Sequence, residues 1–271
     1  MPSYVITGVS RGLGFEFLRQ LCQDSGNTVI GLVRDKPSTD KRVADELKAP
    51  SNVHVLQADI TDYSSLEKAV AAVSEITGGS LDYLVANAGF VSTWDAYDPI
   101  GVLGQSPQKL EEDFLRSFRT NVIANIHLIN LFMPLILRGR VKKVIHVSTG
   151  HADLDPIKDY DADVASGYAM SKAAMNVAVA KFSAQYRKDG VLFISISPGV
   201  VDTGHHADAT PEQMQSLGIM GQKFMKYAPH FRGPIPADES IRAVVSVWEK
   251  ASVEKGDGGS YVSHYGNKQW L

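Results

Sequence analysis

A tyrosine and a lysine four residues apart, Tyr168 and Lys172, form the pair with the clearest capacity for chemistry. On a helix this spacing places both side chains on one face. A free phenol has a pKa near 10, and a neighbouring ammonium favours the phenolate. We therefore expect Tyr168 to exchange protons, with its pKa lowered by Lys172. A packed aromatic beside a solvent-facing lysine is the alternative for the pair taken alone.

A glycine-rich segment, Thr7-Gly8-Val9-Ser10-Arg11-Gly12-Leu13-Gly14, follows the first β-branched run. Glycines there permit a tight turn, let the backbone approach a pyrophosphate and let a helix pack closely on a strand. The helix that follows offers free N–H groups and the positive end of its dipole to an anion. The segment predicts a dinucleotide-binding turn made of Gly8, Ser10, Arg11, Gly12, Leu13 and Gly14.

The end of the second β-branched run bears on the choice between NAD and NADP. Arg34 stands twenty residues after Gly14, where an acidic residue would bind the ribose 2′-hydroxyl of NAD. An arginine there suits the 2′-phosphate of NADPH, and Arg11 could bind the same phosphate. Asp35, one position later, favours NAD instead. We expect NADPH or NADP as the cofactor, with Arg11 and Arg34 as ordinary surface charges in the alternative.

The elements that must position these residues alternate along the chain. Short β-branched runs occupy residues 4–7, 28–33, 53–57, 83–86, 141–147, 191–196 and 260–263. Apolar residues at helical spacing lie between them, for example over 15–22 and 64–76, where Asp62 or Ser64 can cap the second helix. This alternation predicts an α/β fold, a single doubly wound (Rossmann) domain with a central parallel sheet. No linker or repeat divides residues 1–271.

Two segments break the alternation. Residues 150–167 carry five aspartates without a period, and we expect a variable, exposed acidic loop rather than a calcium site. Residues 204–237, with a possible short helix over 214–227, are expected to form an inserted substrate lid. His205 and His206 are interpreted as lid residues, so no metal site is expected. The lid and residues 90–97 would give the substrate pocket an aromatic, adaptable wall of Trp94, Tyr97, Met214, Met220, Phe224, Met225 and Tyr227.

The composition limits the possible functions. Of 271 residues, 44% are apolar, and 27 basic against 30 acidic residues give a formal net charge of −3. Such a chain has no electrostatic footprint for nucleic acid or an anionic membrane. Its one cysteine, Cys22, excludes an intramolecular disulfide and a cysteine-rich metal site. With neither a signal peptide nor a membrane-length apolar run, we expect a cytoplasmic protein.

Four motifs occur in one characteristic order: Thr7-Gly8-x-x-x-Gly12-x-Gly14, Ala86-Asn87-Ala88-Gly89, Tyr168-x-x-x-Lys172 and Pro198-Gly199. Together they resemble the short-chain dehydrogenase/reductase family. Val33-Arg34, Asp59-Ile60 and the extended tail are similar to the NADPH-dependent carbonyl reductases and fungal ketoreductases within that family.

The resemblance implies contacts with the cofactor. Asp59 and Ile60 would hold the adenine, and Lys172 would bind the nicotinamide ribose. Arg119 could add a polar contact, although a solvated helix charge is the preferred interpretation. Asn121 would anchor a water in a proton relay. Further contacts fall to Asn87, Ala88 and Gly89 at the adenine ribose and to Pro198, Gly199, Val200, Val201 and Thr203 at the nicotinamide.

One departure from the family pattern concerns the catalytic hydroxyl. The family carries Ser-Ser after the fifth strand, whereas this chain has Ser148-Thr149, which makes Thr149 catalytic and Ser148 its support. The implied reaction is reduction of a ketone or aldehyde by NADPH, with a bulky or aromatic substrate and Tyr168 as proton donor. The alternatives are an NADP-dependent alcohol dehydrogenase that runs oxidatively and a non-enzymatic NADPH sensor. A homodimer or homotetramer would form through residues 110–133 and 168–188.

Overall fold

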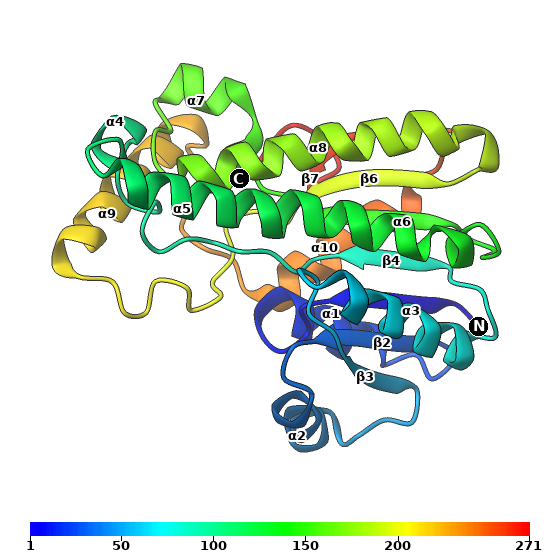
Figure 1. Ribbon diagram of the computed structural model, residues 1–271. Coiled ribbons are helices and arrows are strands. Elements are labelled where there is room, and N and C mark those ends of the chain that lie inside the picture. Colours follow the sequence, from blue (N-terminus) through cyan, green and yellow to red (C-terminus); the bar gives the residue numbers. More distant parts are fainter.

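The computed structural model describes all 271 residues and contains one parallel sheet of seven strands (Figure 1). The strand order is β3-β2-β1-β4-β5-β6-β7, and every neighbouring pair is parallel. The strand positions predicted from the sequence are confirmed to within two residues. The strands are β1 (Ser3–Thr7), β2 (Thr28–Val33), β3 (Val53–Gln57), β4 (Tyr83–Ala86), β5 (Lys143–Val147), β6 (Leu192–Ser197) and β7 (Tyr261–Ser263).

Helices cover both faces of the sheet, as the doubly wound prediction requires. The first three are α1 (Gly12–Leu21), α2 (Lys36–Leu47) and α3 (Tyr63–Thr77), and the next three are α4 (Ile100–Leu103), α5 (Pro107–Phe118) and α6 (Ala124–Ile136). The last four are α7 (Leu154–Tyr160), α8 (Ser166–Tyr186), α9 (Pro211–Tyr227) and α10 (Ala237–Lys250). Side chains of α1, α2 and α10 pack on one face, and those of α3, α6 and α8 on the other. None of these helices is long and apolar enough to cross a membrane.

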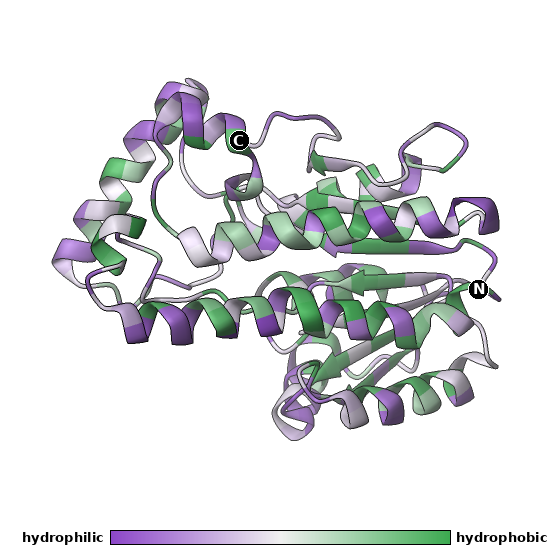
Figure 2. Ribbon diagram, turned by 45° about the horizontal axis from the view of Figure 1, so that its top comes forward, coloured by the Kyte–Doolittle hydropathy of each residue, from purple (hydrophilic) through white to green (hydrophobic).

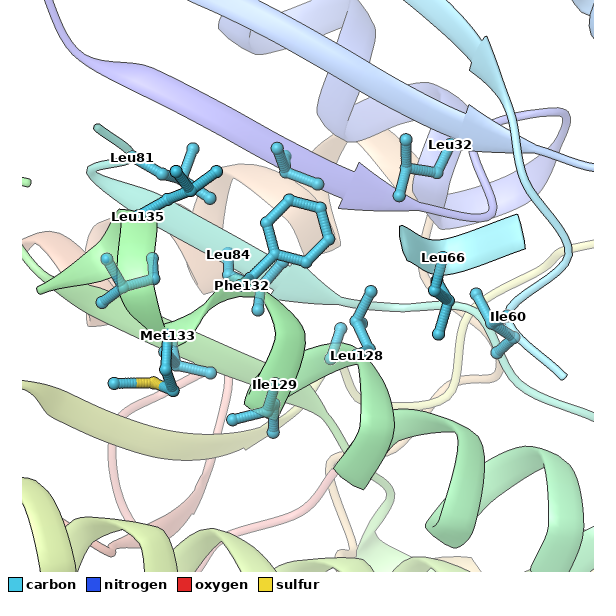
Figure 3. Close-up of a cluster of buried hydrophobic side chains, with 14 of the residues drawn as sticks. Leu32, Ile60, Leu66, Leu81, Leu84, Leu128, Ile129, Phe132, Met133 and Leu135 are labelled. Carbon is cyan, nitrogen blue, oxygen red and sulfur yellow. The ribbon is translucent and has the colours of Figure 1, made fainter. Parts of the chain in front are cut away.

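The two faces of the sheet each carry a continuous hydrophobic core. Hydrophobic residues run along the strands in Figure 2. On the α6 face, Phe132 packs between Leu84 of β4 and Leu128 of its own helix (Figure 3). Full burial of one such side chain stabilises the fold by roughly 1.5–3 kcal/mol. These two cores hold the strand ends, and the turns that follow them, in fixed positions.

Local capping residues set several helix boundaries. The Asp62 carboxylate accepts the backbone N–H groups of Ser64 and Ser65 at the start of α3, and Gly78 ends that helix at φ +65°. Asp35 plays the same part for α2, because its carboxylate accepts the Ser38 N–H at 3.1 Å.

The two irregular segments contain more helix than the sequence predicted. The expectation of a loop over 150–167 is wrong for α7, which begins where Asp153 caps it and ends at Asp161 in a left-handed conformation. Helix α9 begins earlier than expected because Thr210 and Gln213 form a reciprocal capping box. Helices α4, α7 and α9 lie together beyond the carboxyl ends of the strands (Figure 1).

Candidate active site

The sheet order reverses at β1, which lies between β2 and β4. In open α/β sheets, ligands bind in the crevice outside the carboxyl ends of the strands at such a reversal. Hydrogen bonds join the turns after β1 and β4. The Thr7 hydroxyl accepts the N–H groups of Asn87 and Ala88, and the Asn87 amide donates to the Thr7 carbonyl at 2.8 Å. Asn87 therefore braces the glycine-rich turn.

The glycines of this turn are required by backbone geometry. Gly8 and Gly12 have φ values of +76° and +57°, and a Cβ on Gly14 would lie only 2.1 Å from the Gly8 carbonyl oxygen. No side chain caps the start of α1, so its first N–H groups face outward. Thr203 lies opposite, with its methyl 3.7 Å from where a Gly12 Cβ would be. Backbone donors without a capping side chain at the start of a helix suit a pyrophosphate.

Some charged side chains around the end of β2 have no ion-pair partner, whereas others are held in local contacts. Arg11 and Arg34 are exposed and form no ion pair. The Asp35 carboxylate, in contrast, caps α2. Arg42 of α2 was missed from the sequence; it donates to the carbonyl of exposed Ser10 at 3.0 Å and lies 3.9 Å over the Phe15 ring. The guanidinium groups of Arg11 and Arg34, which have no ion-pair partner, therefore belong to the glycine turn and to the end of the neighbouring strand β2.

Asp59 and Ile60 lie at the end of β3 and take part in internal contacts. Oδ1 of Asp59 accepts both the N–H and the hydroxyl of Thr61 at 2.8 Å. Ile60 is buried in the core with Leu66. The half-buried Leu13 side chain packs against the opposite core.

Helix α8 brings Tyr168 and Lys172 to the end of β5. The Lys172 side chain is 4% exposed, and its Nζ donates to the Val147 carbonyl at 2.7 Å. This nitrogen lies 5.9 Å from the centroid of the Tyr168 ring. The Thr149 hydroxyl lies beside the Tyr168 phenol and lowers the pKa of that phenol. The structure thus gathers Thr149, Tyr168 and Lys172 at one place.

The expectation that Lys172 lowers the pKa of Tyr168 is wrong for this structure. Burial raises the pKa of Tyr168 to about 12, and the Thr149 contact offsets only part of that rise. The same burial lowers the pKa of Lys172 to about 8. Desolvation disfavours the charged form of each group, and the lysine directs its N–H to a carbonyl rather than to the phenol.

Ser148 and Thr149 point in different directions. Ser148 is 2% exposed, and its hydroxyl donates to the Asn176 side chain of α8 at 2.8 Å. Thr149 is half-buried, and its hydroxyl accepts the His151 N–H at 3.3 Å. Of the two hydroxyls, that of Thr149 lies beside Tyr168.

Asn121 lies in one π-helical turn, Arg119–Ile123, between α5 and α6. Its amide donates to the Phe90 carbonyl and to the Ser171 hydroxyl, both at 2.9 Å, and its oxygen accepts the Phe90 N–H at 2.7 Å. A Cβ on Gly89 would lie 3.1 Å from the Asn121 oxygen and 3.5 Å from Nζ of Lys172. Asn121 therefore fixes the turn after β4 close to the lysine. Arg119 itself is exposed.

A buried carboxylate that the sequence did not reveal holds the start of α8. The N-cap residue Ala165 has φ +56° and no capping side chain. Asp95, from the loop after β4, substitutes for it: one carboxylate oxygen accepts the N–H groups of Gly167 and Tyr168 at 2.8 and 3.1 Å. Burial raises the pKa of Asp95. No local signal marks this cap, because the partners are more than 70 residues apart.

The segment after β6 is fixed by contacts with α10, Ile235 and His264. Pro198 is buried, and its carbonyl accepts the Ser240 hydroxyl at 2.7 Å. Gly199, at φ +84°, leaves no room for a Cβ, which would lie 2.8 Å from the His264 ring. Val200 and Val201 hold the chain by backbone pairing with Ile235.

The expected lid contacts the loop after β4 and the segment after β5. The Tyr97 hydroxyl and Nδ1 of His206 are 2.9 Å apart, which joins the loop after β4 to residues before α9. Phe224 of α9 meets the His151 ring edge-on at 5.8 Å. Of the expected wall, Tyr97 and Met220 are buried, Met214 and Met225 are exposed, and Trp94, Phe224 and Tyr227 are half-buried.

Comparison with known proteins identifies the class. The family model for short chain dehydrogenase matches residues 3–214. The chain therefore belongs to the short-chain dehydrogenase/reductase family of oxidoreductases, whose members bind nicotinamide cofactors.

Individual relatives extend over the full chain. The short chain dehydrogenase virK of Hypocrea virens is 65% identical over 271 residues, and the short-chain dehydrogenase/reductase iacC of Pestalotiopsis fici is 51% identical over 273, each covering 100% of both chains. Among solved structures, the carbonyl reductase Sniffer of D. melanogaster has a TM-score of 0.77 at 21% identity. The NADPH-bound carbonyl reductase from chicken fatty liver has a TM-score of 0.74 at 22% identity. Both cover 98% of each chain and share the fold.

Proposed function

We propose that the protein reduces the carbonyl group of a ketone or aldehyde with NADPH, and that Tyr168 donates the proton. The observation that carries this proposal is the convergence of Thr149, Tyr168 and Lys172 at the end of β5. Asn121 and Gly89 adjoin the lysine from the end of β4. A protein that only sensed NADPH would have no need for this set of proton-transfer groups.

The residues around the glycine turn fit a phosphorylated dinucleotide. The start of α1 has no side-chain cap, so its backbone N–H groups can bind a pyrophosphate, and Arg11 and Arg34 offer guanidinium groups without an ion pair. Asp35 is engaged as a helix cap, which weakens the case for NAD. When bound, NADPH would supply the hydride, and Lys172 would bind its nicotinamide ribose.

The protonated phenol of Tyr168 can act as the general acid in carbonyl reduction. With a pKa of about 12, the phenol holds its proton at neutral pH and can give it to a developing alkoxide. The Thr149 hydroxyl donates a hydrogen bond to the same oxygen and stabilises its charge. Lys172 adds positive charge, and Asn121 fixes the turn after β4 close to this lysine.

The rim of the site favours a bulky or aromatic substrate. Large apolar side chains remain exposed on the three helices beyond the strand ends: Ile100 and Val102, Leu154 and Ile157, and Met214, Ile219 and Met225. The names of the solved carbonyl reductases support the same reaction class. Exposed Leu115, Met170 and Val177 on α5 and α8 agree with the expected homodimer or homotetramer.

The test is the loss of NADPH absorbance in the presence of aromatic ketones, quinones and small polar ketones, with the corresponding alcohols and NADP assayed in parallel. We expect turnover with bulky carbonyls and little with small polar ones. Turnover confined to the alcohols would favour the oxidative enzyme. NADPH binding without any turnover would favour the sensor.

A further inference from the structure

Tyr261, on the edge strand β7, contacts Thr149, the candidate catalytic hydroxyl residue. This residue begins β7 and pairs with Ser195 of β6. Its hydroxyl donates a hydrogen bond to the backbone carbonyl of Thr149. A side chain from the last strand therefore binds the backbone of the residue whose hydroxyl faces Tyr168.

The C-terminal tail covers this tyrosine. Trp270, the penultimate residue, is 3% exposed and stacks on Tyr261 with ring centroids 4.4 Å apart. Its indole N–H donates to the Asp153 carboxylate at 2.8 Å. Nζ of Lys268 lies 4.5 Å from the centroid of the Tyr261 ring and 3.7 Å from Asp153. The tail thus contacts Asp153 directly and packs on the tyrosine that binds Thr149.

Trp270 packs closely against the backbone next to Thr149. Gly150 directly follows Thr149, and a Cβ on this glycine would lie 2.8 Å from Cβ of Trp270. The tail is also tied to the end of α9. The Trp270 backbone N–H donates to the Tyr227 hydroxyl at 3.0 Å, which itself donates to the Lys268 carbonyl at 3.1 Å.

We propose that Tyr261 and Trp270 are positioning residues that hold the Thr149 hydroxyl in reach of Tyr168 and the substrate oxygen. The inference rests on the role of Thr149 in the proposed function. The Thr149 side chain is otherwise fixed within its own turn only by the His151 N–H at a long 3.3 Å. Burial raises the pKa of Tyr261, so its hydroxyl remains a donor across the physiological range. Misplacement of a reacting group by about 1 Å can cost about 100-fold in rate.

The first experiment tests whether Tyr261 and Trp270 hold the segment around Thr149 in place, and it needs no measurement of catalysis. Hydrogen–deuterium exchange of the peptide spanning residues 147–156 is compared in the full-length wild type, Tyr261→Phe, Trp270→Ala and the control Tyr265→Phe. Tyr265 is exposed on the same tail, and its hydroxyl has no partner. We expect faster exchange in the first two variants and wild-type exchange in the control. Wild-type exchange in both Tyr261→Phe and Trp270→Ala would overturn the proposal, whatever the substrate.

The second experiment separates positioning from binding. Tyr261→Phe should lower kcat by about tenfold to 100-fold, with the KM of the ketone, the Kd of NADPH and the unfolding midpoint close to those of Tyr265→Phe. Trp270→Phe keeps a stacking ring and should recover much of the kcat that Trp270→Ala loses. An unchanged kcat in Tyr261→Phe would overturn the proposal. Failure of the wild type to reduce any ketone would refute the proposed function but not the exchange result.

Discussion

The carboxylate of Asp95 accepts the backbone N–H of Tyr168 across 3.1 Å, although 73 residues separate the two. The same oxygen also accepts the Gly167 N–H, so it replaces the N-cap side chain that Ala165 lacks. The helix that carries both Tyr168 and Lys172 therefore begins on a residue from the loop after β4.

Asp95→Ala should destabilise the protein by roughly 1–3 kcal/mol, because it removes a helix cap and leaves two buried N–H groups unpaired. Chemical denaturation measures the change. Asp98→Ala is the matched control, because Asp98 lies three residues away, is exposed and forms no hydrogen bond or ion pair through its side chain. Equal stability of the two variants would show that Asp95 does not hold the helix.

Thr149→Val should reduce activity more than Ser148→Ala. Loss of one oxyanion donor raises the barrier by roughly 3–4 kcal/mol, whereas the buried Ser148 hydroxyl contacts only Asn176. Ser148→Ala should instead lower stability by roughly 1–3 kcal/mol, since it leaves the half-buried amide oxygen of Asn176 unpaired. Steady-state kinetics of both variants measure the loss of activity, and chemical denaturation measures the loss of stability. The reverse order of activity loss would move the catalytic role to Ser148.

Lys172→Met should remove activity and change the pH dependence of stability. The pKa of this lysine falls from an ordinary 10.5 to about 8 on folding. Between these values the unfolded chain binds more protons, so stability from this group rises with pH. The free energy of unfolding of the wild type, relative to that of the variant, should therefore rise by up to about 3 kcal/mol between pH 7 and 10.

Denaturation at several pH values measures this gain. Lys181→Met, at an exposed position of the same helix, should leave the wild-type slope intact. Identical slopes for the wild type and Lys172→Met would contradict the lowered pKa of the buried Lys172.

Arg34→Ala should weaken NADPH binding far more than NADH binding, because only NADPH carries the 2′-phosphate. A charge-assisted hydrogen bond contributes roughly 1.5–3 kcal/mol, which is about ten- to 150-fold in Kd. Loss of Arg11 as well should exceed either single change. Fluorescence titration measures both constants, with exposed Arg242→Ala on α10 as the control. Equal weakening for the two cofactors would refute NADPH specificity.

The sequence predicts the parts of the site that depend on local patterns. β-branched runs bounded by Gly or Asp locate the strands, and the four-residue spacing of Tyr168 and Lys172 places them on one helix face. The spacing of the glycines likewise locates the turn after β1. Each of these signals lies within a few residues along the chain, where helix and strand periodicity applies.

The remaining features arise from contacts between distant residues. The Asp95 cap on α8 and the Tyr261 bond to Thr149 each join segments more than 70 residues apart. The pKa of Tyr168 has the same origin: the spacing to Lys172 predicted a decrease, but burial by the folded chain raises it. Helix α7 was missed because its exposed sequence lacks an apolar period and depends on capping by Asp153.

The role of Tyr168 as proton donor is tested most directly by Tyr168→Phe, which keeps the packed ring and removes only the hydroxyl. We expect NADPH to bind with nearly the wild-type Kd, while reduction of the best ketone substrate falls below a tenth of the wild-type rate, on the scale of a lost general acid. Titration of NADPH fluorescence and single-turnover loss of NADPH absorbance measure the two quantities on one preparation. A variant that binds NADPH and keeps more than about a tenth of the wild-type rate would contradict the assignment.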